Sequence, residues 1–283
     1  MNLTKWNDGW KFWADRDAFA LVWNVPDIAR HVTLPHDAMM EAEPDPTSPN
    51  GTSTVFRNGD CYTYVKRFTT PEAWKNQTVS VKFEGVYMNA MVYLNGQLCA
   101  KRPFGYTTFY APLDGLLKYG EENELRVQVR AGAMANSRWY SGAGIYRDVY
   151  LVTGGLCHLP DEGIRVTAEE AGDIAVLRVE TEVENREHLS RDIRLENRFV
   201  SPDGSVAASG TIRAVLTPGE KRSLCQRITI KKPCLWNDEH PNLYTLQTVL
   251  LDASKRGKSR YVKLSQQCLQ ALRDEWARKP TVN

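Results

Sequence analysis

The chain has 283 residues, of which 42% are hydrophobic and 25% are charged, and its 36 basic and 34 acidic side chains leave a net charge of +2. This near-neutral balance gives no long-range attraction to nucleic acid or to anionic membranes, so we expect neither as a partner. The length suggests about two domains, and because no apolar run is of signal-peptide or membrane-span type, we expect a cytoplasmic protein.

The first half of the chain is dominated by alternating apolar and polar residues. Val79–Phe83, Leu125–Arg130 and Asp148–Val152 alternate as a strand with one buried face should. Met91–Leu94 runs into Asn95-Gly96, a strong signal for a two-residue hairpin turn. Short strands separated by turn-rich segments predict a β-sandwich.

A second set of strands follows a break at Thr153–Gly155. Ala175–Glu184, Ile193–Val200, Arg227–Ile230 and Leu243–Leu250 again alternate in polarity. About seven strands in roughly 100 residues is the size of an immunoglobulin-like sandwich.

The last thirty residues change character. Gln266–Arg278 has helical spacing and helix-forming composition, which predicts a short helix. The sequence therefore predicts an all-β chain with a β-sandwich over 1–154, an immunoglobulin-like β-sandwich over 155–253, and a divergent helical tail over 254–283.

The six cysteines are scattered and contain no CxxC pair: Cys61, Cys99, Cys157, Cys225, Cys234 and Cys268. This spacing indicates reduced thiols and not a disulfide framework or a zinc site. We expect no metal and no cofactor.

Several motifs follow one another along the chain: Leu34–Asp37, Tyr62–Phe68, Phe83–Ala90, Val92–Gly96, Phe104–Phe109, Ser137–Val149, Pro233–Trp236 and Pro241–Tyr244. Ser137–Val149, which reads SRWYSGAGIYRDV, is the most specific of them. In order and spacing they resemble the N-terminal part of family 2 glycoside hydrolases of the β-galactosidase type. The resemblance extends from about residue 6 to residue 251.

The resemblance implies a galactose-binding-like jelly-roll domain, an immunoglobulin-like domain, and then a TIM barrel carrying two catalytic glutamates. A retaining mechanism needs two carboxyl groups about 5–5.5 Å apart, and a barrel needs roughly 200 or more residues. Only about thirty residues follow the second domain, so we expect neither glutamate here, no catalytic residue, and no hydrolysis by this chain alone. Ser254–Lys258 stands where the family continues toward a Phe-Gly-Ile-Arg-like motif, which leads us to expect a truncation or a frame change near Ser254.

Three residues are candidates for substrate binding by resemblance: Asp37, Arg138 and Trp139. In the family the loop that carries Arg138 and Trp139 approaches the mouth of the barrel, so Arg138 would hold a sugar hydroxyl and Trp139 would stack on a sugar ring. Packing against the barrel is the alternative for both. Asp37 is either a substrate-side group or a partner in a hydrogen bond between domains, and a hydrogen bond to a neighbouring loop is the better interpretation of Glu84.

Three functions compete. The first is a non-catalytic N-terminal portion of a β-galactosidase-like enzyme, the second is a free-standing carbohydrate-binding module, and the third is an interaction module that complements a separate barrel. The expected partner is a carbohydrate, bound weakly, with galactoside as the default and glucuronide and mannoside next. Homo-oligomerisation and docking to a TIM-barrel domain both stay open, because fold alone does not decide function.

Overall fold

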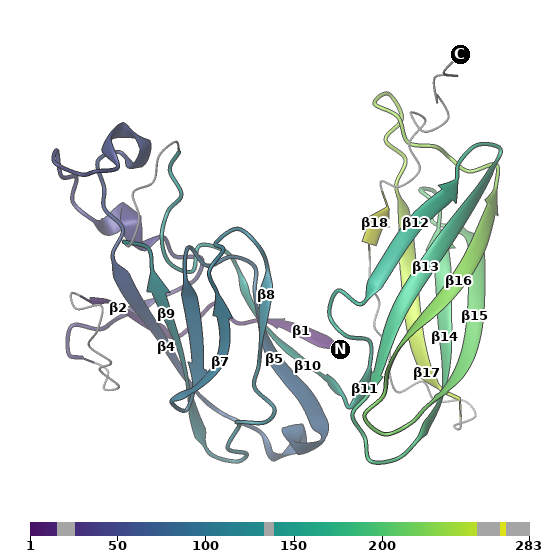
Figure 1. The fold of residues 1–283 in the computed structure, drawn as a ribbon, viewed down its shortest axis with the longest axis horizontal. Coiled ribbons are helices and arrows are strands. Elements are labelled where there is room, and N and C mark those ends of the chain that lie inside the picture. The colour runs from purple at the N-terminus through teal and green to yellow at the C-terminus, as the bar shows by residue number, and fades with distance from the viewer. Residues whose placement is uncertain (16–25, 133–138, 254–266, 270–283) are drawn as a thin grey trace. The chain divides into compact units, whose positions relative to one another are not determined.

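The protein is an all-β chain in a computed structural model that describes residues 1–15, 26–132, 139–253 and 267–269 (Figure 1). It divides into two compact units, one of residues Asn2–Gly154 and one from Gly155 onward. Helix is confined to three short 3-10 segments among these residues, and none of the described helices is long and apolar enough to cross a membrane.

The elements of the first unit are β1 (Asn2–Lys5), β2 (Trp10–Asp15), β3 (Arg30–Val32), η1 (Ala38–Glu41), η2 (Gly51–Thr54), β4 (Cys61–Thr69), η3 (Glu72–Asn76), β5 (Gln77–Phe83), β6 (Ala90–Leu94), β7 (Gln97–Arg102), β8 (Phe109–Pro112), β9 (Glu122–Arg130) and β10 (Val149–Gly155). They form two antiparallel sheets of a jelly roll. One has the order β1-β10-β5-β8 and the other the order β3-β2-β4-β9-β6-β7. Figure 1 shows β4 and β9 running side by side in the second of these.

The core of the first unit lies between its two sheets. Alternation along the strands sends one face of each sheet inward, as in β5, where Val79, Val81 and Phe83 are fully buried. Phe83 stacks on Phe109 of the neighbouring β8, with ring centroids 5.0 Å apart. Trp10 and Trp13 of β2 are both buried, although Trp13 does not belong to the inter-sheet cluster.

The hairpin predicted at Asn95-Gly96 is confirmed. Both residues have positive φ, 50° and 83°, which a two-residue turn joining twisted strands requires. The turn connects β6 and β7 in antiparallel register, with Leu94 opposite Gln97 and Met91 opposite Lys101. The pairing leaves the other end of the hairpin, at Asn89 and Arg102, beside the end of β9.

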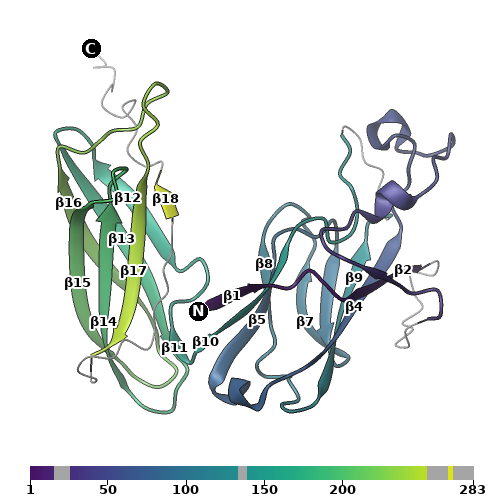
Figure 2. The ribbon, with the colours of Figure 1, turned by 180° about the vertical axis from the view of Figure 1, so that it is seen from behind.

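The elements of the second unit are β11 (Cys157–His158), β12 (Ile164–Glu170), β13 (Ile174–Asn185), β14 (Arg191–Val200), β15 (Val206–Leu216), β16 (Lys221–Lys231), β17 (Tyr244–Asp252) and β18 (Gln267–Leu269). One sheet joins β11, β12 and β16 to β13, and the other has the order β15-β14-β17-β18 (Figure 2). Two antiparallel sheets of this kind form the predicted immunoglobulin-like sandwich.

A buried polar bridge crosses the core of the second unit. The Asn197 amide of β14 donates to Oε1 of Gln226 on β16 at 3.0 Å, and it accepts from the Thr248 hydroxyl of β17 at 2.6 Å. Because these groups are buried, a shift of either sheet would leave them without partners. The bridge therefore favours one alignment of the two sheets.

The helix predicted over Gln266–Arg278 is wrong where the structure describes it. Gln267–Leu269 forms β18, which pairs antiparallel with Tyr244–Leu246 of β17. The backbone groups on the open edge of β17 offer hydrogen bonds that local helical preference does not outweigh. The rest of the predicted helix lies outside the described residues.

Candidate functional site

The site is built around the segment Tyr140–Tyr146, which belongs to the most specific motif of the sequence. Two sides of the jelly roll hold it through the backbone. On one side, the His36 amide donates to the Ile145 carbonyl and the Ala38 amide to the Ala143 carbonyl, both at 2.8 Å. On the other side, Tyr87 and Gly144 exchange two hydrogen bonds of 2.9 and 2.8 Å. The segment is therefore fixed in place at its centre.

The Asp37 carboxylate adds a side-chain anchor to this segment. Its Oδ1 accepts from the backbone amides of Met39 at 3.0 Å and Ala143 at 2.9 Å, and its Oδ2 accepts from the Tyr140 hydroxyl at 2.7 Å. Burial raises the pKa of Tyr140 well above its ordinary value, and the hydrogen bond to Asp37 raises it further. Tyr140 therefore stays a neutral donor, and Asp37 is bound to the protein through both oxygens.

Gly142 and Gly144 make the close approach possible. They have φ values of 68° and 104°, a region of backbone conformation that glycine adopts without strain. A Cβ on Gly142 would lie 2.8 Å from Asp37 Oδ2, and one on Gly144 would lie 2.2 Å from the Tyr64 hydroxyl. Any larger residue would push the segment away from Asp37 and Tyr64.

His36 lies next to this anchor in a row of polar side chains. Its Nδ1 is 2.8 Å from the Tyr64 hydroxyl and its Nε2 is 3.0 Å from Oε1 of Glu41, which also binds Arg30. Burial acts to raise the pKa of Glu41, but hydrogen bonds from Arg30 and His36 outweigh it and lower the pKa. His36 is thus occupied by local partners.

Aromatic rings are exposed at the edge of the anchored segment. Trp139 is 58% exposed and Phe104 is 57% exposed, and the Trp139 indole donates to the Tyr106 hydroxyl at 2.9 Å. Tyr106 packs at 5.6 Å from Phe104 and at 5.3 Å from Tyr87 between ring centroids. We call Phe104, Tyr106 and Trp139 the aromatic surface.

The three candidate residues have different surroundings. Trp139 is exposed, as a ring that stacks on a ligand must be, whereas both oxygens of Asp37 are engaged with the protein itself. Arg138 lies outside the described residues. Glu84 directly follows β5 and accepts from Lys82 of that strand at 2.9 Å, so the partner expected for it in a neighbouring loop is replaced by a local one.

Sequence analysis missed Tyr106 and Phe104 as site residues. They lie in the connection between β7 and β8, and Tyr106 is 33 positions from Trp139 in the chain. Their signal was two aromatic residues separated by one glycine in a segment between strands, where no core position explains them. Gly105 is required at that point, since a Cβ there would lie 2.4 Å from the Tyr87 ring.

Titratable groups do not gather into a metal site in the part of the chain that the structure describes. Free thiols are found at Cys61, Cys99, Cys157, Cys225 and Cys234, and burial raises the pKa of Cys157 to about 11. The features of the described surface that bear on function are therefore stacking rings and polar groups at the edge of a jelly roll.

The fold places the chain in the class of all-β proteins with two sandwich domains, a jelly roll followed by an immunoglobulin-like domain. The model of the galactose-binding domain-like region of glycosyl hydrolase family 2 matches residues 17–143, and the model of glycosyl hydrolases family 2 matches residues 157–263. The chain belongs to glycoside hydrolase family 2, and it corresponds to the N-terminal region of such enzymes.

Relatives from several bacteria share this region. The β-galactosidase BoGH2A of Bacteroides ovatus is 33% identical over 223 residues, which cover 78% of this chain and 26% of that protein. A putative β-glucuronidase of Formosa agariphila is 28% identical, covering 89% of this chain and 24% of its own length. The chain thus spans about a quarter of the length of these curated relatives.

Solved structures show the same fold. A family 2 member from Bacteroides cellulosilyticus has a TM-score of 0.81 at 28% identity, covering 95% of this chain and 36% of its own. A β-glycosidase from Bacteroides vulgatus has a TM-score of 0.80 at 30% identity, covering 95% of this chain and 34% of its own. Both confirm the two-sandwich architecture predicted from the sequence.

Proposed function

We propose that this chain is the non-catalytic N-terminal portion of a β-galactosidase-like glycosidase, and that its jelly roll presents the aromatic surface to a saccharide. The observation that carries the proposal is the placement of Trp139: its ring is 58% exposed while its indole N–H is held by Tyr106. A ring fixed in this way offers an apolar face for stacking at little cost in side-chain entropy.

The anchoring of the neighbouring segment supports the same role. Asp37, Gly142 and Gly144 hold the backbone next to Trp139, so the ring is carried by a rigid frame and not by a free loop. We propose that Asp37 positions this frame, while Trp139 makes the sugar contact. Arg138, adjacent in the chain, is proposed to bind a sugar hydroxyl, as the resemblance implies.

The proposal is tested by measuring binding of a β-galactoside to the full chain by NMR titration. We expect weak binding that Trp139→Ala reduces about ten-fold, since ring stacking contributes about 1–1.5 kcal/mol in exposed sites. Leu98→Ala is the matched control, because Leu98 is an exposed apolar residue near the β6–β7 turn. Equal binding by the wild type and Trp139→Ala would contradict the role of Trp139.

Hydrolysis of chromogenic galactoside, glucuronide and mannoside substrates tests the non-catalytic part of the proposal. We expect no turnover above buffer, because the chemistry of a retaining glycosidase needs a positioned pair of carboxyl groups, which the family places on its barrel. Turnover that disappears when a carboxylate of this chain is substituted would overturn the proposal.

A second candidate function is docking of the aromatic surface against a catalytic domain. The observation that favours it is that Phe104 and Trp139, which both contact Tyr106, expose more than half of their surface. In this case Trp139→Ala would leave galactoside binding unchanged and would weaken association with a family 2 barrel supplied as a separate chain.

A further inference from the structure

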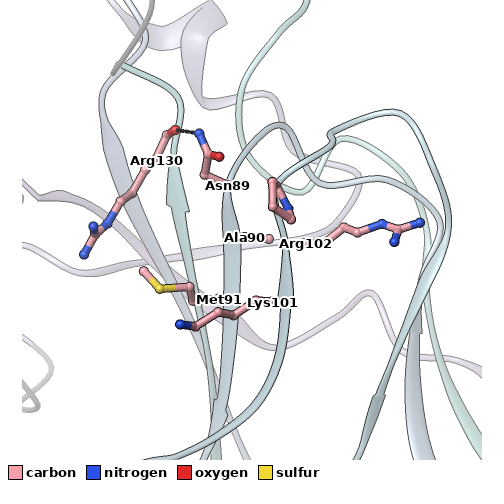
Figure 3. Close-up of a pocket in the computed structure, with 7 residues that line it drawn as sticks. Asn89, Ala90, Met91, Lys101, Arg102 and Arg130 are labelled. Atoms are coloured by element: carbon pink, nitrogen blue, oxygen red, sulfur yellow. Dashed lines mark hydrogen bonds between the residues drawn. The ribbon is translucent and has the colours of Figure 1, made fainter.

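A second feature of the jelly roll is a pocket of about 360 Å³ lined by basic residues at the end of the β6–β7 hairpin. It is formed by Asn89, Ala90, Met91, Lys101, Arg102, Pro103 and Arg130, and no acidic residue is among them. Figure 3 shows the Arg130, Met91 and Lys101 side chains extending to the same side, whereas Arg102 extends the other way. Arg102 instead donates to the Thr107 hydroxyl at 2.7 Å.

The sheet register places Lys101 and Arg130 on either side of Met91. Met91 of β6 pairs with Lys101 of β7 and with Gln128 of β9, and Arg130 follows Gln128 by two residues. The two cationic residues are therefore two strand spacings apart across the sheet and two residues apart along it, about 12 Å between their backbones, a gap that two long side chains can span from both sides. Met91 supplies an apolar floor between them.

Neither cation is neutralised within the described part of the chain. Other basic residues of the same unit pair with carboxylates, such as Arg67 and Arg126 with Glu124 at 3.1 and 2.8 Å. No such ion pair is formed by Lys101 or Arg130 with any described residue. Asp15 lies in the same cross-strand row as Arg130 but two strands away. Its carboxylate accepts hydrogen bonds from the Trp13 indole and the Thr63 hydroxyl.

The backbone around the pocket is held in place. The Arg130 amide donates to the Met88 carbonyl at 2.9 Å, and the Asn89 amide donates to the Pro103 carbonyl at 3.1 Å. The Asn89 side chain donates through Nδ2 to the Arg130 carbonyl at 3.2 Å, which leaves Oδ1 without a partner among the described residues. Two cations, a free amide acceptor and an apolar floor thus surround one pocket.

We propose that this pocket binds the anionic group of an acidic saccharide, a carboxylate or a sulfate, with Lys101 and Arg130 as its ligands. Asn89 Oδ1 accepts from a neighbouring hydroxyl, and the sugar ring lies over Met91. The saccharide part of this assignment rests on the proposed function, since Pro103 of the pocket directly precedes Phe104 of the aromatic surface. The anion-binding part rests on the pocket alone.

The test compares a disaccharide containing glucuronic acid with the same disaccharide reduced to a neutral alcohol at its carboxyl group. Binding of each to the full chain is measured by NMR titration at low salt. We expect the wild type to bind the acidic form about ten-fold more tightly, as two exposed ion pairs allow. In the double variant Lys101→Gln, Arg130→Gln we expect this preference to disappear and binding of the neutral form to be unchanged.

Lys118→Gln is the matched control, because Lys118 is exposed and lies before the start of β9, whereas Arg130 lies at its end. Equal binding of the two disaccharides by the wild type, or a preference that survives in the double variant, would overturn the inference. Inorganic sulfate serves as a third probe. If inorganic sulfate bound at Lys101 and Arg130 while neither disaccharide did, the pocket would be a simple anion site and its assignment to a saccharide would be overturned.

Different results would contradict the proposed function and the assignment of the pocket. If Trp139→Ala left binding of the neutral disaccharide unchanged, the aromatic surface would lose its role. The pocket would still be assigned as an anion-binding site if the double variant abolished the preference for the acidic disaccharide.

Discussion

At the scale of single residues, Asp37 ties the motif that carries Trp139 to the body of the jelly roll. One carboxylate accepts from the nearby Met39 amide and, across more than 100 positions of sequence, from the Ala143 amide and the Tyr140 hydroxyl. Its removal would leave the Ala143 amide and the Tyr140 hydroxyl without their partner. The residue therefore acts through the frame that it holds, and stability is the property that reports on it.

We expect Asp37→Ala to lower the free energy of unfolding of the jelly roll by about 2–4 kcal/mol, because charged hydrogen bonds are lost and half-buried donors are left unpaired. Urea unfolding measures the change. Asp45→Ala is the control, since the Asp45 carboxylate accepts from the amide and the hydroxyl of Thr47 in an exposed turn, and we expect a loss of about 1 kcal/mol or less. Losses of equal size in the two variants would refute the anchoring role of Asp37.

At the scale of elements, β11 adds a buried histidine to the edge of β13. His158 is 6% exposed, its Nδ1 lies 3.2 Å from the Leu156 carbonyl, and its Nε2 is 3.7 Å from Glu184. Burial lowers the pKa of His158 because it disfavours the charged imidazolium, and the hydrogen bond to Leu156 and the charge of Glu184 only partly oppose this.

This shift makes the second domain sensitive to acid. The unfolded histidine takes up its proton near pH 6.5, whereas the folded one does so at lower pH, so the unfolded state binds more protons between these values. The free energy of unfolding therefore decreases as pH falls below about 6.5, until the folded pKa is passed. We expect His158→Asn to weaken this dependence of stability on pH, measured by thermal unfolding from pH 7.5 to 5. The control variant His188→Asn, at an exposed histidine, should retain the dependence.

At the scale of the whole molecule, the described residues form two hydrophobic cores that share no residue. Phe83 belongs to the first and Phe199 to the second, and both are fully buried. Each core lies between its own two sheets, which is the usual basis for a domain that folds as a unit. A destabilising substitution in one core should therefore lower the stability of that domain and leave the stability of the other unchanged.

We expect calorimetry to resolve two unfolding transitions. Phe83→Ala should destabilise one of them and Phe199→Ala the other, each by about 3–5 kcal/mol, through lost burial and the cavity that remains. A single transition that shifts in both variants would show instead that the two domains unfold as one cooperative unit.

The strands that the sequence predicted are those in which one face is fully buried. Val79–Phe83 and Ala175–Glu184 alternate because every second side chain meets the core. β15, which sequence analysis missed, lies at the edge of its sheet, and its run of Ala, Ser and Gly carries little strand preference. The pairing of β18 was missed for the opposite reason, since local helical preference suggested another structure there.

Sequence alone determined the all-β class, the hairpin at Asn95-Gly96 and the family resemblance, because alternation, turn chemistry and motif order are local or linear properties. Tertiary structure decided which side chains meet. It brought Tyr106 to Trp139, Asp37 to Ala143 and Lys101 to the side of Arg130. Such contacts depend on strand order and register in a closed sandwich, and these are set by burial of the whole core and not by any short stretch of residues.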